Sequence, residues 1–133
     1  MYISVNGNVK TLSDAYERTN KLIFNHAPDG DANRSRAVFR VEVAVEDNSE
    51  AYPQLTTDES YTLDIPAVGS ETEVGVQVIK ITAKTVYGAM YGLQSLSQLV
   101  IYDFDSDNYF IPSTPMQIDD APRYPHRGIF SIC

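Results

Sequence analysis

Few residues of this chain combine a reactive side chain with a spacing that could support catalysis. The adjacent carboxylates Asp58 and Glu59 are the first candidates, because paired carboxylates can share general acid and base work. They come at the start of a predicted strand, and no helper residues surround them in the sequence. We therefore interpret the pair as a solvated strand end, and we predict no catalytic and no substrate-binding residue.

The other reactive side chains are isolated. His26 and His126 have no partner at motif distance, and Cys133 is the last residue, where nothing holds a base beside its thiol. The acidic segment 102–108 lacks the glycine and the distal glutamate of a calcium-binding loop. We expect no metal site and no cofactor.

Asn33 begins an N-glycosylation sequon, Asn33-Arg34-Ser35, within the polar, turn-rich segment 27–36. It is a candidate glycosylation site if the protein enters the secretory pathway. The first residues show no basic region followed by a long apolar stretch. No signal peptide is therefore visible, and the localisation of the chain is left open.

The composition narrows the class of protein. With 43% apolar and 21% charged residues, the 133-residue chain is typical of one globular domain. Eighteen acidic and ten basic residues give a net charge of −8, which repels phosphate backbones and argues against a nucleic-acid partner. No stretch reaches the roughly 20 apolar residues that a membrane span needs.

The hydrophobic pattern predicts two helices. Residues 11–25 and 86–100 have apolar side chains at helical spacing, and Thr85 stands where it can cap the second helix. Gly88 and Gly92 are one turn apart in that helix, where each glycine costs about 1 kcal/mol. Such a pair predicts that the helix backbone lies close to a sheet.

Alternating apolar and polar residues predict three strands, at residues 39–46, 60–65 and 74–83. In the third run the alternation slips between Val78 and Ile79, which predicts a bulge or a switch of the buried face. A last strand over 109–118 contains Pro112 and Pro115, so we expect an edge strand or an extended linker. This order predicts an α+β fold, with a mainly antiparallel sheet and two helices packed on one face.

The tail contains an unusual run, DAPRYPHRG, at residues 120–128. Its two prolines favour extended backbone, and an apolar run follows Arg127 and Gly128. Such a run predicts the first strand of a further structural unit.

The second helix and the tail together resemble a known family. Residues 85–100, TVYGAMYGLQSLSQLV, resemble a helix in the N-terminal domain of the eukaryotic-type β-N-acetylhexosaminidases of glycoside hydrolase family 20. The tail looks like the junction between that domain and a (β/α)₈ catalytic barrel. The resemblance covers residues 20–130. It implies an accessory domain over residues 1–118, and a linker with the first-strand stub of an absent barrel over residues 119–133.

The resemblance also implies a chemistry that belongs mostly to the absent barrel. The family removes terminal N-acetylglucosamine or N-acetylgalactosamine with retention, and the acetamido oxygen of the sugar acts as the nucleophile. An Asp-Glu pair of the barrel orients the acetamide and supplies the general acid and base. The expected substrates are glycoconjugates or chitooligosaccharides, and a dimeric, lysosomal or secreted full-length enzyme is implied. We expect this chain alone to be inactive.

The chain departs from the family pattern after Gly128. Ile129-Phe130-Ser131 is followed by Ile132 and Cys133 in place of the expected aspartate. We expect a truncated or artefactual gene product, from a shortened reading frame, a retained intron or an alternative transcript. Arg127 corresponds to an arginine at the start of the barrel that the resemblance implies to be structural, so we favour a buried ion pair or a backbone-carbonyl anchor over a substrate contact. Its partners would lie in the absent barrel, so we expect its guanidinium to stay in water.

A second hypothesis is a non-catalytic module that binds glycans or interacts with another protein, such as a partner's barrel. In its favour, the apolar tail residues Ile129, Phe130 and Ile132 could pair with another chain. Against it, no aromatic cluster forms an evident sugar platform, because Tyr87 and Tyr91 lie on a helix that is expected to pack.

Overall fold

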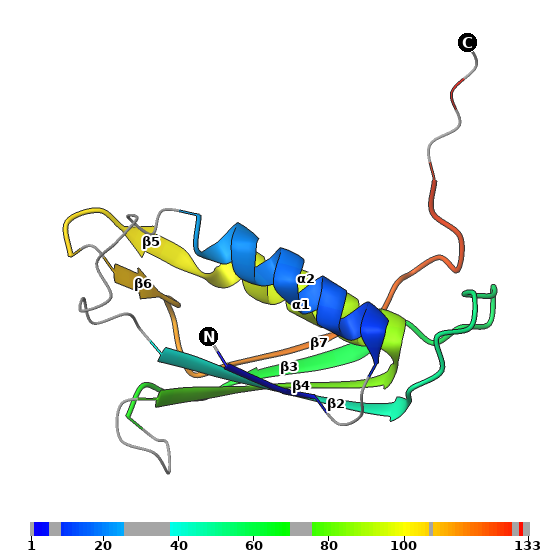
Figure 1. The fold of residues 1–133 in the computed structure, drawn as a ribbon, viewed down its shortest axis with the longest axis horizontal. Helices are drawn as coiled ribbons and strands as arrows, with labels where there is room; N and C mark the ends of the chain where they lie inside the picture. Colours follow the sequence, from blue (N-terminus) through cyan, green and yellow to red (C-terminus); the bar gives the residue numbers. More distant parts are fainter. Residues whose placement is uncertain are drawn as a thin grey trace.

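The computed structural model describes residues 2–5, 9–25, 38–69, 76–106, 108–128 and 131. Both helices lie on one face of a five-stranded sheet (Figure 1), so the predicted α+β fold is confirmed. None of the described helices is long and apolar enough to cross a membrane. The elements in chain order are β1 (Tyr2–Val5), α1 (Lys10–Ile23), β2 (Val38–Asp47), β3 (Tyr61–Ile65), β4 (Val76–Thr85), α2 (Val86–Leu99), β5 (Ile101–Asp103), β6 (Asn108–Phe110) and β7 (Met116–Asp120).

The sheet has the strand order β1-β2-β4-β3-β7. Pairs β3–β4 and β3–β7 are antiparallel, and so is the separate β5–β6 ribbon. The β1–β2 and β2–β4 pairs are parallel, and α1 forms the crossover between β1 and β2. Three of the five described strand pairs are therefore antiparallel. Within the five-stranded sheet the two kinds of pair are equal in number, so this sheet is mixed.

The core lies between the helices and one face of the sheet. Alternate residues of β2, β3 and β4 point to the helices, because successive side chains of a strand point to opposite faces. The fully buried side chains include Leu12, Val41, Leu63, Ile65, Ile79, Ile81, Val86, Leu93 and Leu96. On the opposite face of β4, Lys80, Thr82 and Lys84 are exposed.

The predicted bulge in β4 is wrong. The register against β2 runs without a break, with Val78 opposite Arg40 and Ile79 opposite Val41. One face stays buried throughout, and Gln77 occupies an interior position of that face. Its side-chain amide donates to the carbonyl oxygen of Pro66 at 2.8 Å, which satisfies the buried polar group. This glutamine made the apolar pattern look shifted.

The close approach predicted from the two glycines is confirmed. A Cβ atom at Gly88 would overlap the carbonyl oxygen of Ser60, and one at Gly92 would lie 2.7 Å from Cγ2 of Ile81. The backbone of α2 therefore rests directly on the start of β3 and on β4. Thr85 caps the helix as predicted, since its hydroxyl oxygen accepts from the Gly88 N–H at 3.4 Å.

The single last strand predicted over 109–118 is wrong, because the segment is divided between β6 in the separate ribbon and β7 in the main sheet. Pro112 and Pro115 precede β7, which forms an edge of the sheet. Asp119 and Asp120 belong to β7 and pair with β3, so the sheet includes the first two residues of the predicted linker. Beyond them the chain leaves the sheet at the end of the molecule where both helices begin (Figure 1).

Candidate functional site

The loop between β2 and β3 joins the N-terminal ends of both helices. The Thr11 N–H of α1 donates to Oε1 of Glu50 at 2.6 Å, and the Tyr87 hydroxyl of α2 donates to the carbonyl oxygen of Ala51 at 2.6 Å. The Thr85 hydroxyl donates to the carbonyl oxygen of Asp58 at 2.5 Å. These bonds fix the end of the loop, where the two adjacent carboxylates lie.

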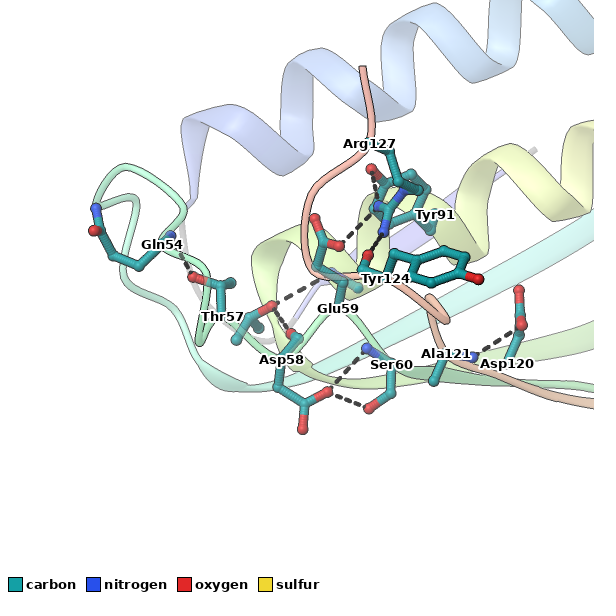
Figure 2. A network of polar contacts seen from close by, with 12 residues as sticks. Gln54, Thr57, Asp58, Glu59, Ser60, Tyr91, Asp120, Ala121, Tyr124 and Arg127 are labelled. Atoms are coloured by element: carbon teal, nitrogen blue, oxygen red, sulfur yellow. Dashed lines mark hydrogen bonds and ion pairs between the residues drawn. The ribbon is translucent and has the colours of Figure 1, made fainter. Parts of the chain in front are cut away.

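Asp58 is held as a charged group. Its Oδ1 accepts from the backbone N–H of Ser60 at 3.0 Å and from the Ser60 hydroxyl at 2.5 Å (Figure 2), and its Oδ2 accepts from Nζ of Lys84 at 2.9 Å. The bonds from Ser60, and then the one from Lys84, lower the pKa of Asp58 to about 2. The same contact raises the pKa of Lys84.

Glu59 points to the other side of the loop and meets the tail. Nη2 of Arg127 donates to Oε2 of Glu59 at 2.8 Å and to the Tyr91 hydroxyl at 3.0 Å (Figure 2). Nη1 of Arg127 donates to the carbonyl oxygen of Tyr124 at 2.9 Å, and the guanidinium lies 5.4 Å from the centroid of the Tyr91 ring. The Glu59 side chain is only 17% exposed, and that of Arg127 is 42% exposed. We call these four residues the Arg127 anchor.

The anchor corrects one expectation from the sequence. The partners of Arg127 lie in this chain, so the prediction that its guanidinium is unpaired is wrong, although the side chain stays partly exposed to water. The hydrogen bonds to Glu59 and Tyr91 raise the pKa of Arg127. The contact joins residues that are 68 positions apart, so no local spacing in the sequence could reveal it.

A hollow whose lining is mostly apolar, with several polar groups among it, lies between α2, β3, β7 and the tail, next to the anchor. Its volume is about 240 Å³. At its floor, the buried Tyr61 hydroxyl is hydrogen-bonded to Oγ of Ser95 at 2.5 Å and donates to Oδ2 of Asp120 at 3.3 Å. We call it the α2 hollow; it is lined by Glu59, Tyr61, Tyr91, Gln94, Ser95, Gln98, Asp120, Pro122 and Arg127.

The other residues singled out in the sequence do not join this site. His126 is exposed. Asn33, His26 and Cys133 lie outside the described residues, as do the apolar tail residues Ile129, Phe130 and Ile132. Within the described part of the chain, no three histidine, cysteine, aspartate or glutamate side chains gather in a group that could hold a metal ion.

The family called "beta-acetyl hexosaminidase like" matches residues 3–99 of this chain. The chain belongs to this family of β-hexosaminidase N-terminal domains. It is 36% identical over 120 residues to β-hexosaminidase subunit B2 of Dictyostelium discoideum, a match that covers 90% of this chain and 20% of the relative. The beta subunit of human β-hexosaminidase is 33% identical over 124 residues, which cover 89% of this chain and 20% of the human protein.

A solved structure shows the same fold. The chitobiase of Flavobacterium johnsoniae superposes with a TM-score of 0.61 at 22% sequence identity, over 96% of this chain and 18% of the chitobiase. The chain, a member of the β-hexosaminidase family, thus spans about a fifth of the length of these relatives.

Proposed function

We propose that this chain acts as the accessory domain of a β-N-acetylhexosaminidase and positions the start of a catalytic barrel. The Arg127 anchor is the observation that supports this role. It ties the tail to both the loop before β3 and helix α2, so the backbone leaves the domain from a fixed point. The whole enzyme would hydrolyse terminal N-acetylhexosamines of glycoconjugates or chitooligosaccharides, as a lysosomal or secreted dimer.

We infer further that these 133 residues alone do not catalyse hydrolysis. The single Asp-Glu dipeptide of the sequence is Asp58-Glu59. A general acid must hold a proton near neutral pH, whereas the pKa of Asp58 is lowered to about 2. Glu59 is engaged by Arg127 and largely buried. Neither carboxylate is placed to protonate a leaving group.

The inactivity can be tested with purified chain and a chromogenic N-acetylglucosaminide. We expect release no faster than in a buffer blank, with a full-length β-hexosaminidase as positive control. Turnover above the blank would contradict the proposal. Its loss in both Asp58→Asn and Glu59→Gln would place the chemistry on the pair.

The positioning role can be tested by replacing the matching N-terminal part of the Dictyostelium relative with this chain. We expect an active chimera. In it, Arg127→Ala should lower the yield of folded enzyme and leave the KM of the folded fraction unchanged, because the anchor touches no reacting atom. The charge exchange Glu59→Arg with Arg127→Glu should restore part of the yield. An Arg127→Ala chimera with normal yield would refute the role of the anchor.

A second candidate function, compatible with the first, is non-catalytic binding of glycans or of another protein. It is favoured by one observation, the α2 hollow beside the anchor.

A further inference from the structure

We propose that the α2 hollow is a binding site for one neutral, hydroxyl-rich sugar ring. The hollow is formed by three parts of the chain that are distant in sequence: the start of β3, helix α2, and the end of β7 with the tail that follows it. Its volume of about 240 Å³ is below the roughly 300–1,000 Å³ of pockets for drug-sized ligands. A single ring therefore suits it better than a longer oligomer buried along its length.

Hydrogen-bond donors and acceptors interrupt the mostly apolar lining. Gln94 and Gln98 stand one helical turn apart on α2, and both are exposed. Neither side-chain amide is hydrogen-bonded to another described residue. Each amide offers donors and an acceptor, whereas the Tyr61 hydroxyl already donates to Asp120 and the Ser95 hydroxyl to Tyr61, so these two hydroxyl groups offer acceptors alone. A sugar ring presents the same mixture, because every hydroxyl group both donates and accepts.

The charges of the hollow select against anionic ligands. The positive charge of Arg127 is already matched by Glu59 at 2.8 Å. The remaining ionisable group at the floor is Asp120, an acceptor for hydroxyl donors and a repulsive group for anions. The net charge of −8 of the chain adds to that repulsion. A phosphate or an acidic sugar is therefore disfavoured, and a neutral ring is favoured.

A wholly apolar ligand is disfavoured as well, although apolar atoms make up most of the lining. It would cover the Gln94 and Gln98 amides and the Asp120 carboxylate without offering them hydrogen bonds, and an unmet polar group costs on the order of 1–3 kcal/mol. The class of ligand thus follows from the hollow itself. The choice of N-acetylglucosamine as the first probe rests on the proposed function.

The test is an NMR titration of the ¹⁵N-labelled 133-residue chain with N-acetylglucosamine, galactose and glucuronic acid. We expect saturable shifts confined to α2 and to residues around Asp120, with a Kd on the order of 1 mM. Gln94→Ala and Gln98→Ala should each weaken binding roughly three- to tenfold, the value of one lost hydrogen bond. Gln54→Ala, a surface glutamine in the loop before β3, is the matched control and should change nothing.

Two results of the titration itself would overturn the site: no saturable shift up to about 50 mM sugar, far above the expected millimolar Kd, or shifts located away from the hollow. Two comparisons would also overturn it. These are binding by the Gln94 and Gln98 variants as tight as by the unsubstituted chain, or binding of glucuronic acid as tight as of the neutral sugars. Because both glutamines are exposed, their variants should fold, which circular dichroism checks. Binding of galactose without N-acetylglucosamine would support the site. A failed titration would leave the chimera result untouched, so the two proposals are separable.

Discussion

Replacing Gly88 by alanine is expected to destabilise the domain, although helix propensity alone predicts the opposite. Alanine is favoured over glycine in a helix interior by about 1 kcal/mol. The new Cβ atom, however, would overlap the carbonyl oxygen of Ser60 and lie 3.2 Å from the Cβ atom of Ala83 and from the carbonyl carbon of Glu59. Two of these three neighbours are backbone atoms, which cannot rotate away.

The loop backbone at this point is also held in place. Asp58 accepts from the Ser60 N–H, and the Thr85 hydroxyl donates to the carbonyl oxygen of Asp58. The overlap with the new Cβ atom can therefore be removed only if α2 moves off the start of β3. Such overpacking costs about 1–3 kcal/mol. The shift would also weaken the Thr85 bonds, worth about 1 kcal/mol together. After subtracting the propensity gain, we expect a net loss of about 2 kcal/mol.

The measurement is urea unfolding followed by circular dichroism at 222 nm. Gln98→Ala is the control in the same helix and should be close to neutral, since glutamine and alanine have similar helix propensities. Gly92→Ala should reduce the free energy of unfolding by less than Gly88→Ala does. Its Cβ atom would meet side-chain atoms of Ile81 and Tyr61, which can adjust more easily than backbone atoms. A Gly88→Ala protein as stable as the wild type would show that the helix is not held against the loop, and would refute the reasoning.

Three further predictions concern the polar contacts. Arg127→Ala should speed amide hydrogen exchange across residues 121–128 and leave the exchange rates of β2 and β4 unchanged. Glu59→Gln should have the same effect, because it removes the same ion pair. Additive effects in the double variant would contradict the pairing. The pKa of Asp58 in the folded chain is about 2, below its ordinary 3.8, so its stabilising contribution is present above pH 3.8 and disappears as pH falls through about 2. Asp58→Asn should therefore be less stable than the wild type at pH 7, with a gap that closes in acid; urea unfolding at several pH values measures it, and a constant gap would count against the assignment. Tyr61→Phe should lose about 1 kcal/mol in the same unfolding assay, because it removes a buried hydrogen-bonded hydroxyl, and a neutral result would show that this hydroxyl adds nothing.

The local elements could be predicted because their periodicity is set by burial against one face. Both helices and the strands at 39–46 and 60–65 follow from that pattern. Strand β1 was missed because four residues, YISV, are too few to show a period, and its parallel pairing depends on the crossover through α1. The slip at Val78 was misread because a buried glutamine interrupts the apolar series.

The site was less predictable than the fold. Arg127 could be singled out from the tail, but its partner Glu59 could not, because their contact exists only once β3 starts beside α2. Gln94 and Gln98 look like ordinary exposed helix residues in the sequence. Only the placement of β7 and the tail beside them creates the hollow.

The edge position of β7 has a consequence for how the domain is made. The five residues Met116–Asp120 pair with the whole length of β3, which precedes them by more than fifty positions. While the chain is being synthesised, β3 keeps an open edge until Asp120 has left the ribosome, and an open edge can recruit another chain. The family match ends at residue 99, before this strand. A domain boundary cut there would leave the sheet without its last strand, and we expect such a fragment to aggregate.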